Sequence, residues 1–343
     1  MTTPIIRAEG WDAPVGGMTW GWVGERGTWD TVAARQSMTA MAELNVNWVT
    51  LAFAAVQATA QSTEIPFRDE PTVTDDEIRA AAAMARTLAL KVCLKPVVNV
   101  ADGTWRAHIG FFDVDVPGEP TWSQWFASYR DFILHHAHLA AELDAEMLCI
   151  GCEMVRADAQ DAHWRSLIDD VRAVYDGLIT YNCDKYQEGR VTWWDAVDVI
   201  SSSGYYPTGT WDEHLDRIEA VVRHHGKPFL FMETGCPSRE GSPARPNDWT
   251  LQGAPSEKAQ ASWLDEMFTA CARRPWVGGF MLWDWQPDLY PIDEAPLNDD
   301  YALYGKEGAT VVAAHYTRML TPFLSPGPAA PSPRLLTIQD DAS

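Results

Sequence analysis

The chain has few basic residues for its length and no long apolar run. Of its 343 residues, 26 are Lys or Arg and 48 are Asp or Glu, which gives a formal net charge of -22 at pH 7. A surface of that charge repels phosphate backbones and anionic lipids, so we expect neither nucleic acid nor a membrane as a partner. No segment approaches the roughly 20 apolar residues of a membrane helix, and the first residues do not resemble a secretion signal. The sequence therefore predicts a cytoplasmic protein with a neutral or cationic ligand, of undetermined oligomeric state.

Cysteine and histidine are scarce and poorly placed for metal binding. The six cysteines mostly lie in or beside apolar segments of strand length, as expected of free thiols in a reducing compartment. Cys149 and Cys152 have CxxC spacing, but they lie along one strand with no second pair nearby in sequence. Cys152, Cys183 and Cys236 could gather at one rim, so a disulfide or redox role stays open for them. Histidines are nearly absent from the strand ends, and we predict no metal and no cofactor.

A glycine-rich phosphate loop is missing as well. Residues 16–22 (GGMTWGW) place indoles where a nucleotide needs bare backbone, so an open doubly wound sheet is the less favoured architecture.

What the chain does contain is a regular alternation of short apolar segments with longer amphipathic ones. The strand-like segments are residues 16–22, 47–54, 91–99, 146–152, 178–183, 198–204, 228–233 and 278–284. The helix-like segments are residues 29–44, 74–89, 121–142, 161–176, 211–225, 256–273 and 307–320, with a short one at 192–196.

This alternation is typical of parallel strands joined by crossover helices. Eight units favour closure into a (β/α)8 TIM barrel, an α/β fold of about 250 residues before loop insertions. We therefore expect a single barrel domain over residues 1–324. The remaining residues, 325–343, begin with a Pro/Ser/Ala-rich stretch, residues 325–332, and are predicted to form a flexible C-terminal tail.

Two of the strand-like segments lead into a glutamate: Glu153 directly follows residues 146–152, and Glu233 is the last of residues 228–233. An isolated carboxylate in apolar surroundings costs several kcal/mol unless it is paired, so packing alone does not explain these positions. Two carboxylates at the open end of a barrel are what glycoside cleavage needs. Taken singly, Glu153 could instead form a salt bridge with Arg156, and Glu233 could cap a helix. Their joint placement favours catalysis.

Aromatic and amide side chains gather at the same strand ends. The chain has 17 tryptophans, and an indole face can pack against the apolar face of a pyranose ring. Amides and tyrosines beside two glutamates indicate a sugar cleft rather than a metal site. The residues that we expect to contact sugar are Trp20, Trp22, Asn99, Trp105, Asn182, Tyr205, Tyr206, Trp283 and Asp284.

The sequence resembles the clan A glycoside hydrolases, most closely family 113, the β-1,4-mannanase family. The matching segments cover most of residues 90–290 and read DGTWR, CIGCEM, WRSLIDDVRAVYDGLITYN, WWDAVDVISSSGYYP, KPFLFMETG and FMLWDW. The resemblance implies that Glu153 is the acid/base, Glu233 the nucleophile and Trp283 a sugar platform, with Tyr205 or Tyr206 as the tyrosine near the sixth strand end. The chain departs from the clan at Cys152, where an asparagine usually contacts the sugar 2-hydroxyl, and this leaves the preferred sugar open.

These residues predict a retaining glycoside hydrolase acting on β-1,4-linked mannose-containing oligosaccharides or polysaccharides. In a retaining site the carboxyl groups are about 5–5.5 Å apart, so Glu233 would form a covalent glycosyl-enzyme that water then hydrolyses with Glu153 as base. Two alternatives stay open. One is a β-glycosidase for another sugar, such as glucose or xylose, and the other is a non-catalytic carbohydrate-binding barrel. Endo or exo action and the number of subsites are not determined.

Overall fold

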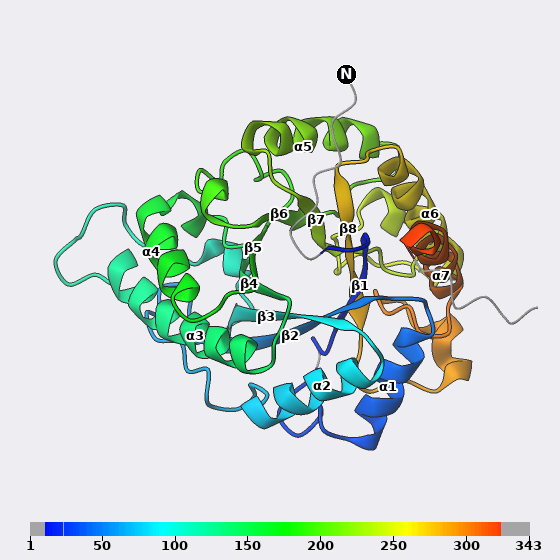
Figure 1. The fold of residues 1–343 in the computed structure, drawn as a ribbon, viewed down its shortest axis with the longest axis horizontal. Coiled ribbons are helices and arrows are strands. Elements are labelled where there is room, and N and C mark those ends of the chain that lie inside the picture. Colours follow the sequence, from blue (N-terminus) through cyan, green and yellow to red (C-terminus); the bar gives the residue numbers. More distant parts are fainter. Residues whose placement is uncertain (1–10, 23, 324–343) are drawn as a thin grey trace, which may run out of the picture.

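The computed structural model describes residues 11–22 and 24–323. Figure 1 shows strands at the centre of the molecule with helices around them. The strands are β1 (Val15–Trp20), β2 (Trp48–Gln57), β3 (Lys91–Val100), β4 (Met147–Cys152), β5 (Leu178–Cys183), β6 (Val199–Ser203), β7 (Phe229–Thr234) and β8 (Val277–Trp285). The α-helices are α1 (Val32–Ala42), α2 (Asp75–Thr87), α3 (Trp122–Glu142), α4 (Asp161–Arg172), α5 (Trp211–His225), α6 (Glu257–Ala272) and α7 (Glu307–Leu320).

The eight strands form one closed parallel barrel in sequence order, with β8 paired to β1. This confirms the predicted (β/α)8 fold. Because all strands run in the same direction, their carboxyl ends meet at one rim, where the residues at the ends of β4 and β7 can approach each other. The predicted tail, residues 325–343, lies outside the described residues, and among the described residues no helix has the length and apolarity needed to cross a bilayer.

The helix starts follow from local hydrogen bonds. The Thr74 side chain accepts from the backbone N–H of Glu77, while the Glu77 carboxylate accepts from the backbone N–H of Thr74, so α2 begins with a capping box. Ser256 caps α6 by accepting from Ala259 N. Both starts agree with the sequence prediction. At the other end of a helix, Gly226 adopts the left-handed conformation that stops α5, with φ of 64°.

The connection from β5 to β6 departs from the others because it contains no α-helix. Only a 3-10 helix, Trp194–Ala196, lies in this stretch, where the sequence predicted a short helix. Trp193 and Trp194 are fully buried and cover the strands here in place of a helix. The Trp193 ring stacks on that of Trp164 in α4 with centroids 4.8 Å apart, which ties the connection to the helical layer.

The apolar core has two parts. The larger one lies between the strands and the helices, and the smaller one includes Cys93, Met147, Cys149 and Leu230. Side chains alternate along a strand, so Lys95 lies on the same side of β3 as Cys93 and continues the smaller cluster toward the carboxyl rim. The smaller cluster therefore fills the barrel below a polar layer.

Candidate active site

Glu153 and Glu233 lie at the carboxyl ends of their strands, as predicted. Glu153 directly follows β4, and Glu233 is the penultimate residue of β7. The pairing register shifts in both places, between Cys149 and Cys152 on β4 and just before Glu233 on β7. Such irregularities turn side chains out of the regular alternation and are common beside active sites. Both glutamates are buried, which places their carboxylates inside the rim.

The carboxylate of Glu233 is held from two sides. Its Oε2 accepts a hydrogen bond from Lys95 Nζ at 2.7 Å, and its Oε1 accepts one from the Tyr205 hydroxyl at 2.9 Å. Burial raises the pKa of Glu233, but the charges of Lys95 and Arg106 and the two hydrogen bonds outweigh burial and lower it below its ordinary value. Glu233 is therefore an ionised carboxylate at neutral pH.

Glu153 has a different set of partners. Its Oε1 accepts from Ser203 Oγ at 2.8 Å, and its Oε2 accepts from both Trp105 Nε1 and Arg106 Nη1 at 3.2 Å. Its ion pair is thus with Arg106 and not with Arg156, the alternative partner that the sequence suggested. The backbone of Glu153 has a φ of 52°, which is uncommon outside glycine, and its N–H donates to Asn182 O at 2.7 Å. β5 therefore fixes the direction in which the Glu153 side chain leaves the strand.

The two carboxylates belong to one polar network. Arg106 Nη1 lies 3.2 Å from Glu153 Oε2 and 3.6 Å from Cys152 Sγ, which in turn lies 3.5 Å from Glu233 Oε2. On the other side, Asn182 donates to Ser203 Oγ at 2.9 Å and accepts from Lys95 Nζ at 3.4 Å. Each glutamate is thus joined to the other through these shared neighbours, which brings the two carboxylates into one network at the rim.

Aromatic rings border this network. The rings of Trp22 and Trp283 are 5.2 Å apart, and the Arg106 guanidinium lies 5.3 Å from the Trp22 ring. Trp105 is 41% exposed although its Nε1 binds Glu153, so one face of this indole is accessible. Asn99 accepts from Arg106 Nη2 at 2.9 Å. These four predicted sugar-contact residues, Trp22, Asn99, Trp105 and Trp283, therefore gather around the two glutamates.

Two further carboxyl groups lie nearby. Burial, together with the charge of Asp300, raises the pKa of Asp284 to about 7, although a hydrogen bond from its own backbone N–H acts in the opposite direction. Burial and the charge of Glu153 raise the pKa of Asp184, at the end of β5, to about 7. Asp284, which follows Trp283, was among the predicted sugar-contact residues, while Asp184 was not predicted.

Comparison with known proteins agrees with this site. Residues 18–306 match the model of Glycoside Hydrolase Family 113. The chain belongs to this family. It is 50% identical to a GH113 β-1,4-mannanase of known structure, over 89% of this chain and 99% of that one, with a TM-score of 0.88. It is 46% identical to the GH113 β-mannanase AaManA from Alicyclobacillus acidocaldarius, solved in complex with ManMIm, over 90% and 98% of the two chains, with a TM-score of 0.87.

More distant structures share the fold alone. A β-glucuronidase from Ruminococcus gnavus is 13% identical over 91% of this chain and 52% of that one, with a TM-score of 0.58. No curated protein matches the chain. The family membership makes this protein a glycoside hydrolase, as the sequence predicted.

Three predicted sugar contacts of the family 113 enzyme need correction. Trp20 is fully buried behind β1, where its ring packs against that of Trp29 and its Nε1 donates to Ser37 Oγ at 3.1 Å. Tyr206 is fully buried as well, and its hydroxyl donates to Glu188. Asn182 is fully buried beneath the two glutamates. None of the three can touch a sugar, and Asn182 instead orients the residues around it.

Lys95, Arg106 and Ser203 contact the glutamates but were not predicted. Lys95 could have been found by the reasoning that identified Glu153 and Glu233, because it is a charged residue inside an apolar strand. Arg106 begins the 3-10 helix Arg106–His108 after β3, and Ser203 ends a run of three serines, so neither stood out in sequence.

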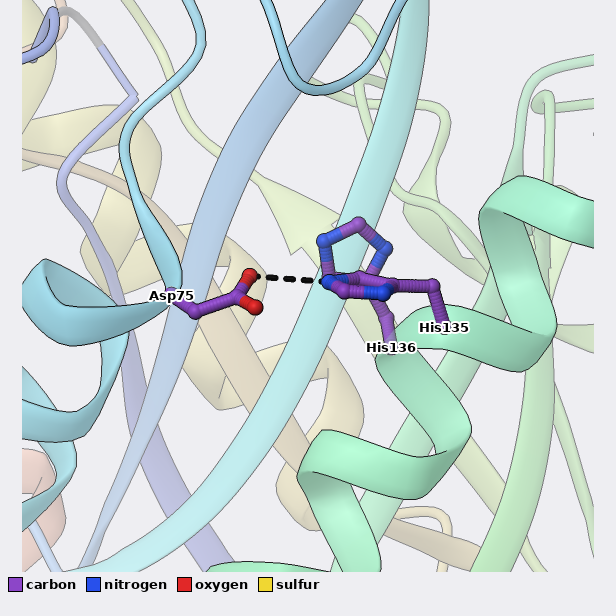
Figure 2. Close-up of side chains that lie close together, drawn as sticks. All are labelled: Asp75, His135 and His136. Carbon is purple, nitrogen blue, oxygen red and sulfur yellow. Dashed lines mark hydrogen bonds and ion pairs between the residues drawn. The ribbon is translucent and has the colours of Figure 1, made fainter.

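The family 113 enzyme has one group of side chains with metal-ligand types among its described residues, Asp75, His135 and His136 (Figure 2). His135 Nε2 lies 2.9 Å from Asp75 Oδ1, while its Nδ1 lies 3.3 Å from Arg68 Nη2. Burial lowers the pKa of His136 to about 3, and its Nδ1 bonds Phe132 O. Both His135 nitrogens have partners and the Arg68 charge repels a cation, so this group joins α2 to α3 rather than forming a metal centre.

The cysteines are all free and buried. The disulfide that the sequence left open for Cys152, Cys183 and Cys236 is therefore not formed. Burial raises the pKa of Cys152 well above its ordinary value, so this residue is a neutral thiol between the two glutamates.

Proposed function

We propose that the enzyme hydrolyses β-1,4-linked mannose-containing saccharides with retention, using Glu233 as nucleophile and Glu153 as acid/base. The observation that carries the assignment is the difference between their surroundings. Glu233 is paired with a buried ammonium and has a lowered pKa, as a nucleophile requires. The named activity of the family members at about half identity supports the choice of substrate.

The first step replaces one bond at the anomeric carbon by another. A Glu233 oxygen bonds C1 of the sugar while the glycosidic C1–O bond breaks, and Glu153 gives its proton to the leaving oxygen. The Tyr205 hydroxyl, 2.9 Å from Glu233 Oε1, keeps the carboxylate in position for this attack. Attack from the face opposite the leaving group inverts C1 and forms a glycosyl-enzyme.

The second step releases the sugar. Water attacks C1 from the vacated side, Glu153 takes its proton, and the electron pair of the C1–O bond returns to Glu233. Ser203 keeps its hydrogen bond to Glu153 Oε1 and orients this residue toward the water. Because the configuration at C1 is inverted twice, the product retains it.

Sugar binding rests on the aromatic and polar residues of the rim. Trp283 and Trp105 offer ring faces for a pyranose, and Asp284 and Asn99 offer oxygen acceptors for its hydroxyls. A chain of several sugars would extend along these residues. Oligosaccharide is therefore the proposed partner of the site.

The test uses two variants and an external nucleophile. Glu233→Ala and Glu153→Ala should each lower the hydrolysis of mannotriose at least a thousandfold. Azide should rescue both on aryl β-mannobiosides, giving the α-mannosyl azide from Glu233→Ala and the β-mannosyl azide from Glu153→Ala. Product NMR from the parent enzyme must show the β-anomer first. Initial formation of the α-anomer would refute retention.

A substrate panel separates the alternatives. Aryl β-mannosides, β-glucosides and β-xylosides are compared with manno-oligosaccharides, and hydrolysis of glucosides without mannosides would remove the proposed substrate. If the parent and Glu233→Ala bound oligosaccharide equally and neither released reducing ends, the barrel would be a binding protein.

We also propose a cytoplasmic location, where imported short saccharides would be cleaved. Its support is the set of six buried free thiols, which suits a reducing compartment. Cell fractionation tests this, since recovery of the protein outside the cell would contradict it.

A further inference from the structure

Lys95 is an ammonium group enclosed in the barrel. It projects from the middle of β3, and its side chain is 1% exposed. Its Nζ lies 2.7 Å from Glu233 Oε2 and 3.4 Å from Asn182 Oδ1, and 5.8 Å from the centre of the Trp283 ring. Cys93 and Cys149 fill the space below it. Lys95 therefore sits directly beneath the nucleophile, between the apolar core and the cleft.

Lys95 stays charged in this position. Burial would lower its pKa, but the charge of the Glu233 carboxylate and the hydrogen bond to it raise the pKa above its ordinary value. A buried charge is tolerated when an opposite charge compensates it. Within the described residues, Glu233 is the one carboxylate within ion-pair distance of Lys95. The charge balance of this enclosed site thus depends on a single partner.

That partner is the group that the proposed reaction neutralises. When Glu233 becomes an ester, Lys95 keeps its charge and loses its carboxylate, because the part of the chain that the structure describes places no other carboxylate within ion-pair distance of it. The ion pair is intact in the free enzyme, absent in the glycosyl-enzyme, and restored when water releases the sugar. Electrostatics at Lys95 therefore oppose formation of the ester and favour its breakdown.

We propose that Lys95 is a positioning residue that speeds the second half of the reaction at the expense of the first. The inference rests on the double displacement of the proposed function. In the second step the water oxygen bonds C1, its proton goes to Glu153, and the electron pair of the breaking C1–O bond returns to Glu233 opposite Lys95. Lys95 itself gains and loses no proton.

The variant Lys95→Met keeps the length of the side chain and removes its charge. Loss of one preorganised group that stabilises developing charge typically costs about a hundredfold in rate, and we expect this loss in release of the sugar from Glu233. Attack by Glu233 should be at least as fast as in the parent, because the variant removes the ion pair that opposes formation of the ester. The glycosyl-enzyme should then accumulate. Lys95→Arg keeps the charge and should stay within about tenfold of the parent in both steps.

The measurement is rapid mixing with 2,4-dinitrophenyl β-mannobioside, whose leaving group needs no acid. Lys95→Met should release one equivalent of dinitrophenol in a burst and then turn over slowly, and intact mass spectrometry should find the mannobiosyl adduct on Glu233. The acid limb of kcat/KM should also move to higher pH, since the charge of Lys95 contributes to the lowered pKa of Glu233. If the role of Lys95 were purely structural, its replacement would change neither the ratio of the rates of the two steps nor the pH profile of kcat/KM.

Equal losses in both steps, or no adduct at steady state, would overturn the proposal. Circular dichroism checks the fold, and if Lys95→Met does not fold, Lys95→Gln is measured in the same way. Glu153→Ala with Lys95 intact separates this proposal from the function itself. That variant lacks the base for the second step and must trap the Glu233 adduct, so its failure to do so would refute the double displacement and not the role of Lys95.

Discussion

Asp158 allows a quantitative prediction for the stability of the enzyme. It lies in a 3-10 helix just after β4, and its side chain is almost fully buried. The Tyr181 hydroxyl donates to its Oδ1, while its Oδ2 is buried without a partner among the described residues. Burial raises the pKa of Asp158 to about 8, against an ordinary value of 3.8. The folded protein therefore holds this acid neutral at pH 7.

The sign and size of the effect follow from proton linkage. Below pH 3.8 both the folded and the unfolded chain bind the proton, so Asp158 has no pH-dependent effect there. Between 3.8 and about 8 only the folded form keeps it, and the free energy of unfolding falls by about 1.4 kcal/mol per pH unit. At pH 7 this amounts to about 4 kcal/mol. Asp158→Asn removes this cost.

The asparagine keeps an oxygen for the Tyr181 hydroxyl but leaves an amide N–H without a partner, which costs about 1–3 kcal/mol. We therefore expect Asp158→Asn to be more stable than the parent by roughly 1–3 kcal/mol at pH 7, with no gain near pH 4. Urea unfolding at several pH values between 4 and 8.5 measures the difference. Asp170→Asn is the matched control, because this acid is paired with Arg130 at the surface and its pKa is lowered. A difference between parent and Asp158→Asn that is the same at every pH would refute the reasoning.

Three further variants test other contacts. Tyr205→Phe removes the hydrogen bond to Glu233 Oε1, so kcat/KM on mannotriose should fall about 10- to 100-fold and its acid limb should move to higher pH. Ser203→Ala removes the hydrogen bond to Glu153 and should lower kcat about tenfold with KM little changed, and a change confined to KM would contradict the proposed contact. Thr74→Ala breaks the capping box of α2 and should lower the free energy of unfolding by about 1 kcal/mol in urea titrations, with activity unchanged.

Much of the barrel could be predicted because each strand carries its own signal. The apolar segments 47–54 and 228–233 correspond to β2 and β7, and Glu153 and Glu233 stand out because a charge interrupts apolar sequence. Whether a segment forms a strand or a helix is indicated by the pattern of its own residues, and this local pattern can be read from a single sequence.

The side of the barrel wall on which a residue lies was harder to predict. Tyr205 and Tyr206 are adjacent in sequence, yet the first bonds Glu233 and the second bonds Glu188 behind the barrel. Adjacent side chains near a strand end point in opposite directions, and register shifts change which of them faces inward. Trp20 was misplaced for the same reason. The partners of Lys95 depend on contacts between distant strands, which no local pattern contains.

The β5–β6 connection has a consequence for the order of folding. Its two strands are close in sequence, and its buried tryptophans Trp193 and Trp194 cover them without waiting for a distant helix. Contacts of short sequence separation form at lower entropic cost, so we expect this hairpin-sized unit to assemble early and the seam between β1 and β8 to close last. Pulsed hydrogen exchange during refolding would contradict this if β1 amides gained protection before those of β5. Asn182 and Ser203, which contact Glu153 from β5 and β6, would then be in place before the closed barrel exists.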